Sequence, residues 1–379
     1  MTYSQNDVLR IAKRVNNTKR SYLLVNRLQA KHIPVSPGRA LEMMEQLGDL
    51  LAQKYPDTRL VIGFAETATA IGAAVASRFG DDCIYLHTTR ESLPEVERWV
   101  LFSEEHSHAV EQKLCGDRLT RWISASDSVL FVDDEISTGK TLINMMHQLR
   151  AQFPVLSGRR LAAASLLNRV SPEHERRMAE AGLRCEWLVR VDMVDPAQAA
   201  AAFQVEEAAP VEAAETRFSH AALDCAPLPD PRTGVSIRGY RDSCEEMSSA
   251  FLQAAGALLG GFDRAVVLGT EECMYPALIL GKRLEERGLS VRCHATTRSP
   301  IGICSAPDYP ITSGRRLSSF YEEGRDTYIY NFSRCDALIV VSDAPSFRPE
   351  ALNQLAAAWA PYEPKRIFFI QGGHDVWYV

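Results

Sequence analysis

Short apolar runs alternate with amphipathic segments along most of the chain. In the first half, apolar runs cover residues 60–65, 83–87, 129–133 and 161–167, and each has the length of a buried strand. Helical patterns separate them: one helix is predicted from Ala68 to Ser77, one begins after Ser36-Pro37, and one opens at Leu142. Buried strands alternating with helices are typical of a parallel sheet flanked by helices. The pattern therefore predicts an α/β fold.

The second half repeats this plan. Residues 264–271 match the run at 60–66, a helix is expected over 277–284, and residues 337–343 stand where residues 129–134 stand. Any two α/β domains share such a rhythm. However, the string Thr88-Thr89-Arg90 returns in the same order as Thr296-Thr297-Arg298, so we predict a second α/β domain that is a degenerate copy of the first.

Between the halves, residues 195–217 are rich in Ala, Glu and Pro and contain few large apolar residues. This composition predicts a linker, with a transient helix around residues 199–202. The 379 residues are enough for two domains with separate cores. We therefore expect domains at 1–194 and 218–379, joined by the linker at 195–217.

Charge and cysteine content narrow the function classes. The net charge of −6 argues against nucleic acid as a partner, because binding to a phosphate backbone usually needs a basic face. The nine cysteines include no Cys-x-x-Cys pair, so structural zinc and a disulfide framework are both disfavoured. The N-terminus has no signal pattern and no apolar run could cross a bilayer, which predicts a cytoplasmic protein without a membrane partner.

The most specific motif runs from Val132 to Thr141. Two carboxylates, Asp133 and Asp134, stand where the apolar strand is expected to end, and a turn rich in hydroxyl groups follows them. Backbone N–H groups at a turn and helix N-terminus suit a phosphate dianion. Carboxylates beside it can accept hydrogen bonds from ribose hydroxyls or hold a magnesium ion. The motif therefore predicts recognition of a sugar phosphate.

Two other interpretations of this motif explain less. A Walker A loop needs a glycine where Asp134 stands. An ordinary turn capped by Ser137 or Thr138 leaves the paired acids unexplained. The stretch resembles the phosphoribosyl pyrophosphate (PRPP) loop of type I phosphoribosyltransferases: two apolar residues, two acids, two variable residues, then Thr/Ser-Thr-Gly-x-Thr. The resemblance implies transfer of ribose 5-phosphate from PRPP to an acceptor, release of pyrophosphate, and Mg²⁺ as cofactor. It places the 5′-phosphate on Ser137, Thr138, Gly139, Lys140 and Thr141.

The resemblance also assigns the other parts of the site. The turn formed by Glu66, Thr67, Ala68 and Thr69 corresponds in order to the pyrophosphate loop, and Arg90 could neutralise the leaving group. A helix cap by Thr67 and a surface ion pair of Arg90 with Glu91 or Glu95 are the alternatives. His106 and His108 stand where the family has a mobile hood, and could donate a proton or bind pyrophosphate. The alternative is that both histidines face solvent and have no role in the site.

One departure from the family limits the acceptor. Purine-salvage members commonly place an aspartate, acting as base, where Ser137 stands. Either Glu135 or a hood residue then handles the proton, or the acceptor needs no strong base. Hypoxanthine-type salvage is therefore disfavoured, and the catalytic candidates are Asp133, Asp134 and Glu135, with the two aspartates also the candidate direct or indirect ligands of Mg²⁺.

A second motif, Thr297, Arg298, Ser299 and Pro300, makes the resemblance more specific. A Thr-Arg-Ser-Pro (TRSP) domain following such a transferase domain resembles the phosphoribosyltransferases of bacterial tellurium-resistance and stress-response operons. This implies a nucleobase-like small-molecule acceptor and other enzymes of the same operon as partners. The motif could bind a phosphate or the acceptor, or Arg298 could be a structural loop arginine.

The sequence thus predicts a cytosolic, magnesium-dependent phosphoribosyltransferase. A PRPP-sensing or scaffold protein without turnover is the alternative, because Ser137 replaces the base and the acceptor is unidentified. A third hypothesis is that the protein catalyses the reverse reaction, phosphorolysis of a ribonucleotide. Homodimers are common among related folds, but no feature of the sequence establishes one.

Overall fold

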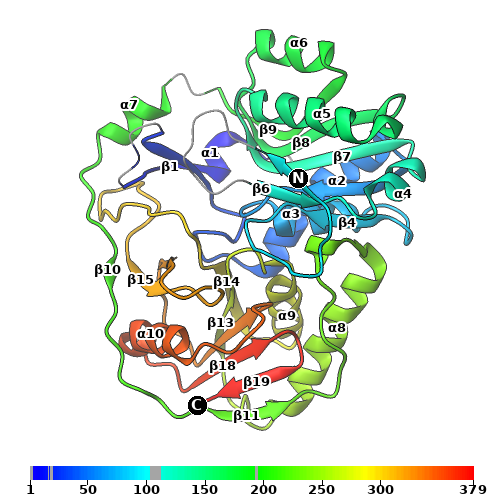
Figure 1. Ribbon diagram of the computed structural model, residues 1–379. Helices are drawn as coiled ribbons and strands as arrows, with labels where there is room; N and C mark the ends of the chain where they lie inside the picture. The colour runs from blue at the N-terminus through cyan, green and yellow to red at the C-terminus, as the bar shows by residue number, and fades with distance from the viewer. Residues whose placement is uncertain (1–2, 16, 18–19, 103–111, 193–194) are drawn as a thin grey trace. The chain divides into compact units, whose positions relative to one another are not determined.

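The computed structural model describes residues 3–15, 17, 20–102, 112–192 and 195–379 (Figure 1). The chain divides into two units. Unit 1 consists of Met1–Gln5, Glu42–Met193 and Pro229–Arg241, and unit 2 of Asn6–Leu41, Val194–Leu228 and Asp242–Val379. Residues 6–41 therefore belong to unit 2 and residues 229–241 to unit 1. The division predicted from the sequence, at 1–194, 195–217 and 218–379, puts residues 6–41 in the first domain and residues 229–241 in the second.

The sheet of unit 1 has the strand order β12-β4-β3-β7-β8-β9. Neighbouring strands pair in parallel, except that β12 is antiparallel to β4. The apolar runs of β3, β7 and β8 are buried on both faces, as expected of parallel strands covered by helices. The predicted α/β fold is confirmed. The strands are β12 (Val235–Ser236), β4 (Ile84–His87), β3 (Thr58–Gly63), β7 (Ser128–Ile136), β8 (Arg160–Asn168) and β9 (Leu183–Arg190).

Helix α3 (Thr69–Ala76) is buried over its whole length, because it consists of small and apolar residues. A side chain at Gly72 would place its Cβ 2.8 Å from the ring of Tyr85, so glycine is required for α3 to lie this close to β4. The remaining elements of this part of the chain are α1 (Gln5–Val8), α2 (Pro37–Lys54), β5 (Trp99–Phe102), β6 (Gln112–Cys115), α4 (Leu119–Ser124), α5 (Lys140–Gln152), η1 (Pro154–Leu156), α6 (Pro172–Glu180) and η2 (Pro231–Thr233).

The sheet of unit 2 has the strand order β11-β19-β18-β17-β13-β14. The four strands from β14 to β18 are parallel, and β19 and β11 are added antiparallel. The strands are β11 (Ser219–Ala222), β19 (Asp375–Tyr378), β18 (Arg366–Gln371), β17 (Ala337–Ser342), β13 (Arg264–Gly269) and β14 (Ser290–Ala295). Two hairpins accompany this sheet, β1 (Leu9–Lys13) with β2 (Tyr22–Asn26), and β15 (Gly314–Ser318) with β16 (Asp326–Tyr330).

Helices cover both faces of the second sheet. Helix α10 (Pro349–Trp359) packs its buried Leu352 and Leu355 against one face, in a cluster that includes Phe369 of β18. Phe368, the residue before Phe369 on β18, points to the opposite face of the sheet because side chains alternate along a strand. On that face its ring packs against Phe251 of α8 (Ile237–Ala254), with ring centroids 5.3 Å apart. Two further elements complete this unit, α9 (Tyr275–Glu286) and η3 (Ala360–Tyr362).

Unit 2 repeats the strand order of unit 1. The series β4-β3-β7-β8 has its counterpart in β14-β13-β17-β18, which supports the predicted duplication. The fifth strand differs, since β9 is parallel to β8 but β19 is antiparallel to β18. Register shows what replaces the acid pair in unit 2. Gly63 pairs with Val132 and Gly269 with Val341, so Ser342 and Asp343 occupy the positions of Asp133 and Asp134.

Residues 195–217 fold against unit 2. Asp195 accepts hydrogen bonds from the N–H groups of Ala197 and Gln198 at 3.0 Å and thereby caps α7 (Pro196–Ala201), where a transient helix was expected. Glu206 and Ile303 exchange backbone hydrogen bonds at 2.9 Å, and β10 (Ala209–Pro210) pairs with β15. The composition of this segment predicted a linker, but its backbone is held by unit 2.

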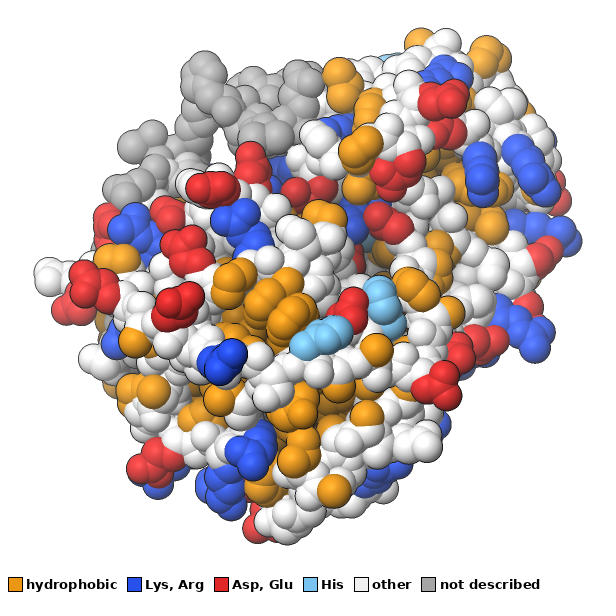
Figure 2. Space-filling view, turned by 60° about the horizontal axis from the view of Figure 1, so that its bottom comes forward, with side chains coloured by type: hydrophobic (Ala, Val, Ile, Leu, Met, Phe, Trp, Pro, Cys, Tyr) orange, Lys and Arg blue, Asp and Glu red, His pale blue; other side chains and the backbone are white. Residues whose placement is uncertain are grey.

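The described surface carries mixed charge. On the face shown in Figure 2, acidic and basic side chains are interspersed. No helix within the described ranges is long and apolar enough to cross a bilayer.

Candidate functional site

The carboxyl ends of β4, β3 and β7 lie next to one another because these strands are neighbours in a parallel sheet. Backbone hydrogen bonds tie the three ends together. The N–H of Thr88 donates to Gly63 O at 2.9 Å, and the N–H of Phe64 donates to Val132 O at 2.9 Å. The candidate residues that follow each strand are therefore gathered at one edge of unit 1.

The predicted pyrophosphate turn lies between β3 and α3. The N–H of Ala65 donates to Thr88 Oγ1 at 2.9 Å, and the Ala65–Glu66 peptide bond is cis. Ala68 and Thr69 are buried, whereas Glu66 and Thr67 are half-buried. Of the four candidates in this turn, the side chains of Glu66 and Thr67 are the ones that a ligand could reach.

Thr67 does not cap α3. The N-cap residue is Ala68, with no side-chain capping hydrogen bond. Instead, Thr67 Oγ1 donates to Asp134 Oδ1 at 2.8 Å. This contact joins the turn after β3 to the acid pair, and the capping alternative for Thr67 is wrong.

The acid pair lies inside β7, not at its end. Pairing with β8 continues through Asp133 with Ser165, Glu135 with Leu167, and Ile136 with Asn168. The prediction that the strand ends at the aspartates is wrong by three residues, because β8 is also nine residues long and supplies partners to the full strand.

Burial and the neighbouring Asp134 carboxylate raise the pKa of Asp133 well above its usual range. Its Oδ1 accepts a hydrogen bond from the N–H of Asp134 at 2.9 Å. The largely buried Glu135 lies 3.7 Å from the guanidinium of Arg169.

The predicted phosphate loop begins directly after β7. Gly139 is left-handed, with φ of 67°, and serves as N-cap of the 13-residue α5, where Ile143 N–H donates to Gly139 O at 2.9 Å. Ser137 is half-buried, and Thr138, Lys140 and Thr141 are exposed. The first N–H groups of a helix have no intrahelical partners and carry its positive dipole end. This arrangement can hold a phosphate group.

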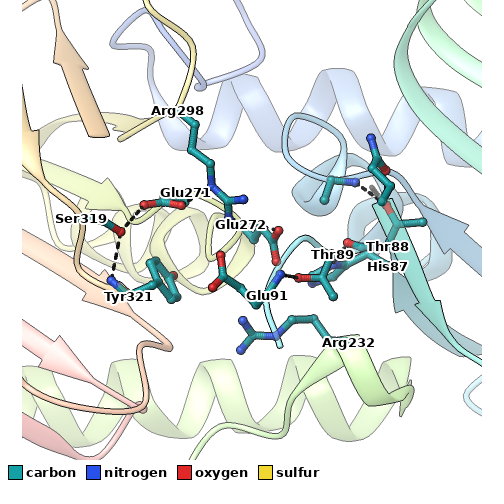
Figure 3. A network of polar contacts seen from close by, with 12 residues as sticks. His87, Thr88, Thr89, Glu91, Arg232, Glu271, Glu272, Arg298, Ser319 and Tyr321 are labelled. Carbon is teal, nitrogen blue, oxygen red and sulfur yellow. Dashed lines mark hydrogen bonds and ion pairs between the residues drawn. The ribbon is translucent and has the colours of Figure 1, made fainter. Parts of the chain in front are cut away.

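Arg90 follows Thr89 on the segment after β4. Thr89 and Lys113 exchange backbone hydrogen bonds at 2.8 and 3.0 Å, and Thr89 Oγ1 accepts from Glu91 N–H at 2.9 Å (Figure 3). These bonds fix the backbone on both sides of the half-buried Arg90. Thr88 Oγ1 also donates to Gln112 Oε1 at 2.7 Å, so the first residue of β6 is anchored beside the site. His106 and His108, the hood candidates between β5 and β6, lie outside the described residues.

The Thr-Arg-Ser-Pro motif belongs to unit 2. Thr297 pairs with Tyr328 through two backbone hydrogen bonds, and Thr297 Oγ1 accepts from Ser299 N–H at 3.2 Å. The guanidinium of Arg298 contacts two buried carboxylates, Glu271 at 2.5 Å and Glu272 at 3.4 Å. Sequence reasoning assigned no role to these two glutamates. One difference in the sequence could have pointed to Glu271: it stands two positions after Gly269, whereas the first copy has Ala65 two positions after Gly63.

No group of three or more His, Cys, Asp or Glu in the described part of the chain is placed to hold a metal ion. The two aspartates of β7 therefore supply carboxylates without a complete ligand set. A magnesium ion is compatible with them as an ion bound jointly with substrate, since Mg²⁺ commonly takes one or two carboxylates plus substrate phosphates.

Comparison with solved structures gives distant likenesses. An adenine phosphoribosyltransferase from Giardia lamblia, in complex with 9-deazaadenine, is 15% identical with a TM-score of 0.36, over 51% of this chain and 100% of that one. The Trypanosoma brucei adenine enzyme is 12% identical, with a TM-score of 0.33, over 52% and 89%. Orotate phosphoribosyltransferase from Aeropyrum pernix is 16% identical, with a TM-score of 0.28, over 48% and 87%. These likenesses are too distant to specify a substrate.

Comparison with protein families is more informative than comparison with solved structures. No protein with a curated description matches the chain. Residues 8–200 match the family described as phosphoribosyl transferase, and residues 232–359 match the TRSP domain that lies C-terminal to it. The first match covers half of the chain and contains the acid pair, the phosphate loop and the turn after β3. The chain therefore belongs to the phosphoribosyl transferase family, carries a C-terminal TRSP domain, and is an enzyme of the glycosyltransferase type.

Proposed function

We propose that unit 1 transfers ribose 5-phosphate from PRPP to a small, nucleobase-like acceptor and releases pyrophosphate. Ser137–Thr141 bind the 5′-phosphate, Asp133 and Asp134 bind the ribose hydroxyls, and the Glu66–Thr69 turn with Arg90 faces pyrophosphate. Breaking the bond between ribose C1 and pyrophosphate develops positive charge on the sugar ring, as in glycoside hydrolysis. Carboxylates near the ring stabilise that charge.

The hydrogen bond from Thr67 to Asp134 is the observation that carries this proposal. It links the pyrophosphate turn to the ribose-binding acids, so the two ends of the bond that breaks are held by connected side chains. The left-handed Gly139 starts α5 five residues after Asp134, and the N-terminus of this helix supports binding of the 5′-phosphate close to the acids. A single PRPP molecule needs these three elements together.

Mg²⁺ would supply charge neutralisation to the departing pyrophosphate. Asp134 and Asp133 would hold it directly or through water, together with oxygens of PRPP.

Proton transfer to or from the acceptor has two candidates. Glu135 is largely buried and lies 3.7 Å from the guanidinium of Arg169. His106 or His108 is the other candidate, and Ser137 disfavours hypoxanthine-type acceptors. An acceptor that loses its proton readily fits this site best.

We further propose that the enzyme acts in the cytoplasm, in a tellurium-resistance or stress pathway with other enzymes of the same operon. Loss of tellurite tolerance in a deletion strain, restored by the intact gene, tests this role. Unchanged tolerance would contradict it. Light scattering of the purified protein tests whether it forms the homodimer common among related folds.

Isothermal titration of PRPP with Mg²⁺ tests the site itself. Asp133→Asn combined with Asp134→Asn should abolish binding. The matched control is Asp57→Asn combined with Asp127→Asn, which changes the charge equally at two exposed carboxylates that precede β3 and β7, at the opposite edge of the same sheet. Equal affinity in both double variants would refute the site. Pyrophosphate release with acceptors from cell extract then tests turnover, and tight binding without release would favour a PRPP sensor.

A further inference from the structure

We propose that unit 2 retains the anion cradle of the first copy, but that the carboxylate of Glu271 fills it in place of a bound oxyanion. This inference concerns unit 2 alone and does not depend on PRPP binding to unit 1. It predicts that removing this side chain opens a site for a small oxyanion.

The two cradles share their backbone framework. In unit 1, Ala65 N–H donates to Thr88 Oγ1 at 2.9 Å and Thr88 N–H donates to Gly63 O at 2.9 Å. In unit 2, Glu271 N–H donates to Thr296 Oγ1 at 3.0 Å and Thr296 N–H donates to Gly269 O at 3.0 Å.

Two positions follow from this framework. Glu271 stands where Ala65 stands, and Arg298 stands where Arg90 stands, because each arginine comes two residues after its threonine. The second copy has therefore gained a carboxylate at the point where the first copy has a methyl group.

Glu271 makes the contacts that a bound oxyanion would make. Its Oε2 accepts from Arg298 Nε at 2.5 Å and its Oε1 accepts from Ser319 Oγ at 2.8 Å (Figure 3). Its Oε2 also accepts from Arg325 Nη2 at 3.3 Å. The carboxylate side chain is 0% exposed. Two guanidinium groups and a hydroxyl converging on one pair of oxygens is the geometry of phosphate and carboxylate recognition.

A buried lysine reinforces this position. The side chain of Lys31, 1% exposed, donates from Nζ to Glu271 O at 2.7 Å and to Thr296 O at 3.0 Å. A cation that bonds to the main-chain oxygens of Glu271 and Thr296 links the two turns of the cradle and holds their backbone in place. The chain thus devotes three cationic side chains to the surroundings of one glutamate.

In unit 2, the positions that correspond to Asp134 and to the phosphate loop also contact other side chains of the unit. Asp343, at the position of Asp134, accepts a hydrogen bond from Tyr321 OH at 2.5 Å. The loop at the position of the phosphate loop contains Pro345 and Pro349, and its Phe347 stacks on Trp377 with ring centroids 4.0 Å apart. Side chains of unit 2 therefore replace ligand contacts at each of the three elements.

Chemical rescue tests the role of Glu271. Glu271→Ala removes both charge and volume, whereas Glu271→Gln removes the charge and keeps the volume. We expect Glu271→Ala to lower the Tm by roughly 10 °C, since it removes a buried carboxylate that pairs with both Arg298 and Arg325. Sodium formate, compared with sodium chloride at equal ionic strength, should raise the Tm of Glu271→Ala by about 5 °C more than that of the wild type or of Glu271→Gln.

Asp336→Ala is the matched control. Asp336 is another largely buried carboxylate of unit 2, held by the N–H groups of Asp263 and Arg264 and by Lys365, without paired guanidinium groups. Formate should not rescue it to the same degree. Equal formate effects on Glu271→Ala, Glu271→Gln and Asp336→Ala would overturn the proposal.

A double-mutant cycle covers the case in which Glu271→Ala does not fold. Glu271→Gln and Arg298→Met each remove one charge with little change of volume. If the carboxylate serves as the counter-ion, the double variant should lose less Tm than the sum of the single losses. Additive losses would contradict the proposal.

Discussion

Gly139 offers a sharp test of the phosphate loop. Its φ of 67° lies in the left-handed region, and a Cβ at this position would stand 2.3 Å from Sδ and 2.9 Å from Cγ of Met178. Met178 is the buried residue of α6 and is 0% exposed, so it has little room to move away. Gly139→Ala therefore meets two separate penalties.

The magnitudes follow from these two penalties. The left-handed backbone costs a residue with a Cβ about 1–2 kcal/mol, and overpacking a filled core costs about 1–3 kcal/mol. We expect Gly139→Ala to lower the free energy of unfolding by about 2–5 kcal/mol. It should also weaken PRPP binding at least about tenfold, because relief of the overlap displaces the N–H groups that we propose bind the 5′-phosphate.

Gly158 supplies the matched control. Its φ is 88°, but no atom lies within 4 Å of the position of a Cβ. Gly158→Ala should therefore lose about 1–2 kcal/mol and keep its PRPP affinity. Denaturant unfolding and calorimetric titration measure both quantities. Equal destabilisation of the two variants with unchanged PRPP affinity in Gly139→Ala would refute the reasoning. In a Met178→Ala background, Gly139→Ala should cost about 1–3 kcal/mol less than in the wild type.

Three further predictions concern single side chains. Thr67→Val removes the donor to Asp134 and should weaken PRPP binding about tenfold in a titration, since hydrogen bonds to charged groups contribute about 1.5–3 kcal/mol; unchanged affinity would contradict the link between the two elements. Asp133→Asn should stabilise the protein at pH 7, because the pKa of Asp133 is raised in the native state. The gain should disappear as pH falls below about 4, where the carboxyl is protonated in both folded and unfolded chains; a gain that persists there would count against this cause. Burial lowers the pKa of His294 from 6.5 to about 4, so the wild type should lose about 3 kcal/mol more stability than His294→Gln as pH falls from 6.5 to 4; parallel losses in acid unfolding would exclude His294 as the source.

Local patterns predicted the central elements well. The runs at 60–65, 129–133 and 161–167 became β3, β7 and β8, because continuous burial on both faces leaves a clear apolar signal. The helix predicted from Ala68 to Ser77 is α3, one residue shorter at each end. The two-residue strand β12 and the hairpin of β1 with β2 were not predicted, since such short segments carry no periodicity and their partners are distant in sequence.

The candidate site was predicted in part. Sequence order placed the acid pair, the phosphate loop and the turn after β3 at one edge, because parallel strands share their carboxyl ends. The bond between Thr67 and Asp134 could not be read from the sequence, as it depends on which strands are neighbours. The environment of Glu271 escaped prediction for the same reason: its partners come from four separate segments, around residues 31, 298, 319 and 325.

Each of the two units is built from segments that are not contiguous in the sequence, and this affects both the synthesis of the chain and the design of shorter fragments. Residues 6–41 are translated first, yet their unit is completed only when residues 242–379 have been synthesised. A gene truncated near position 195 would encode a transferase half that lacks β12 and still carries a hairpin from the other unit. The smallest independently expressed fragment of either half must therefore be assembled from non-contiguous pieces, by circular permutation or co-expression.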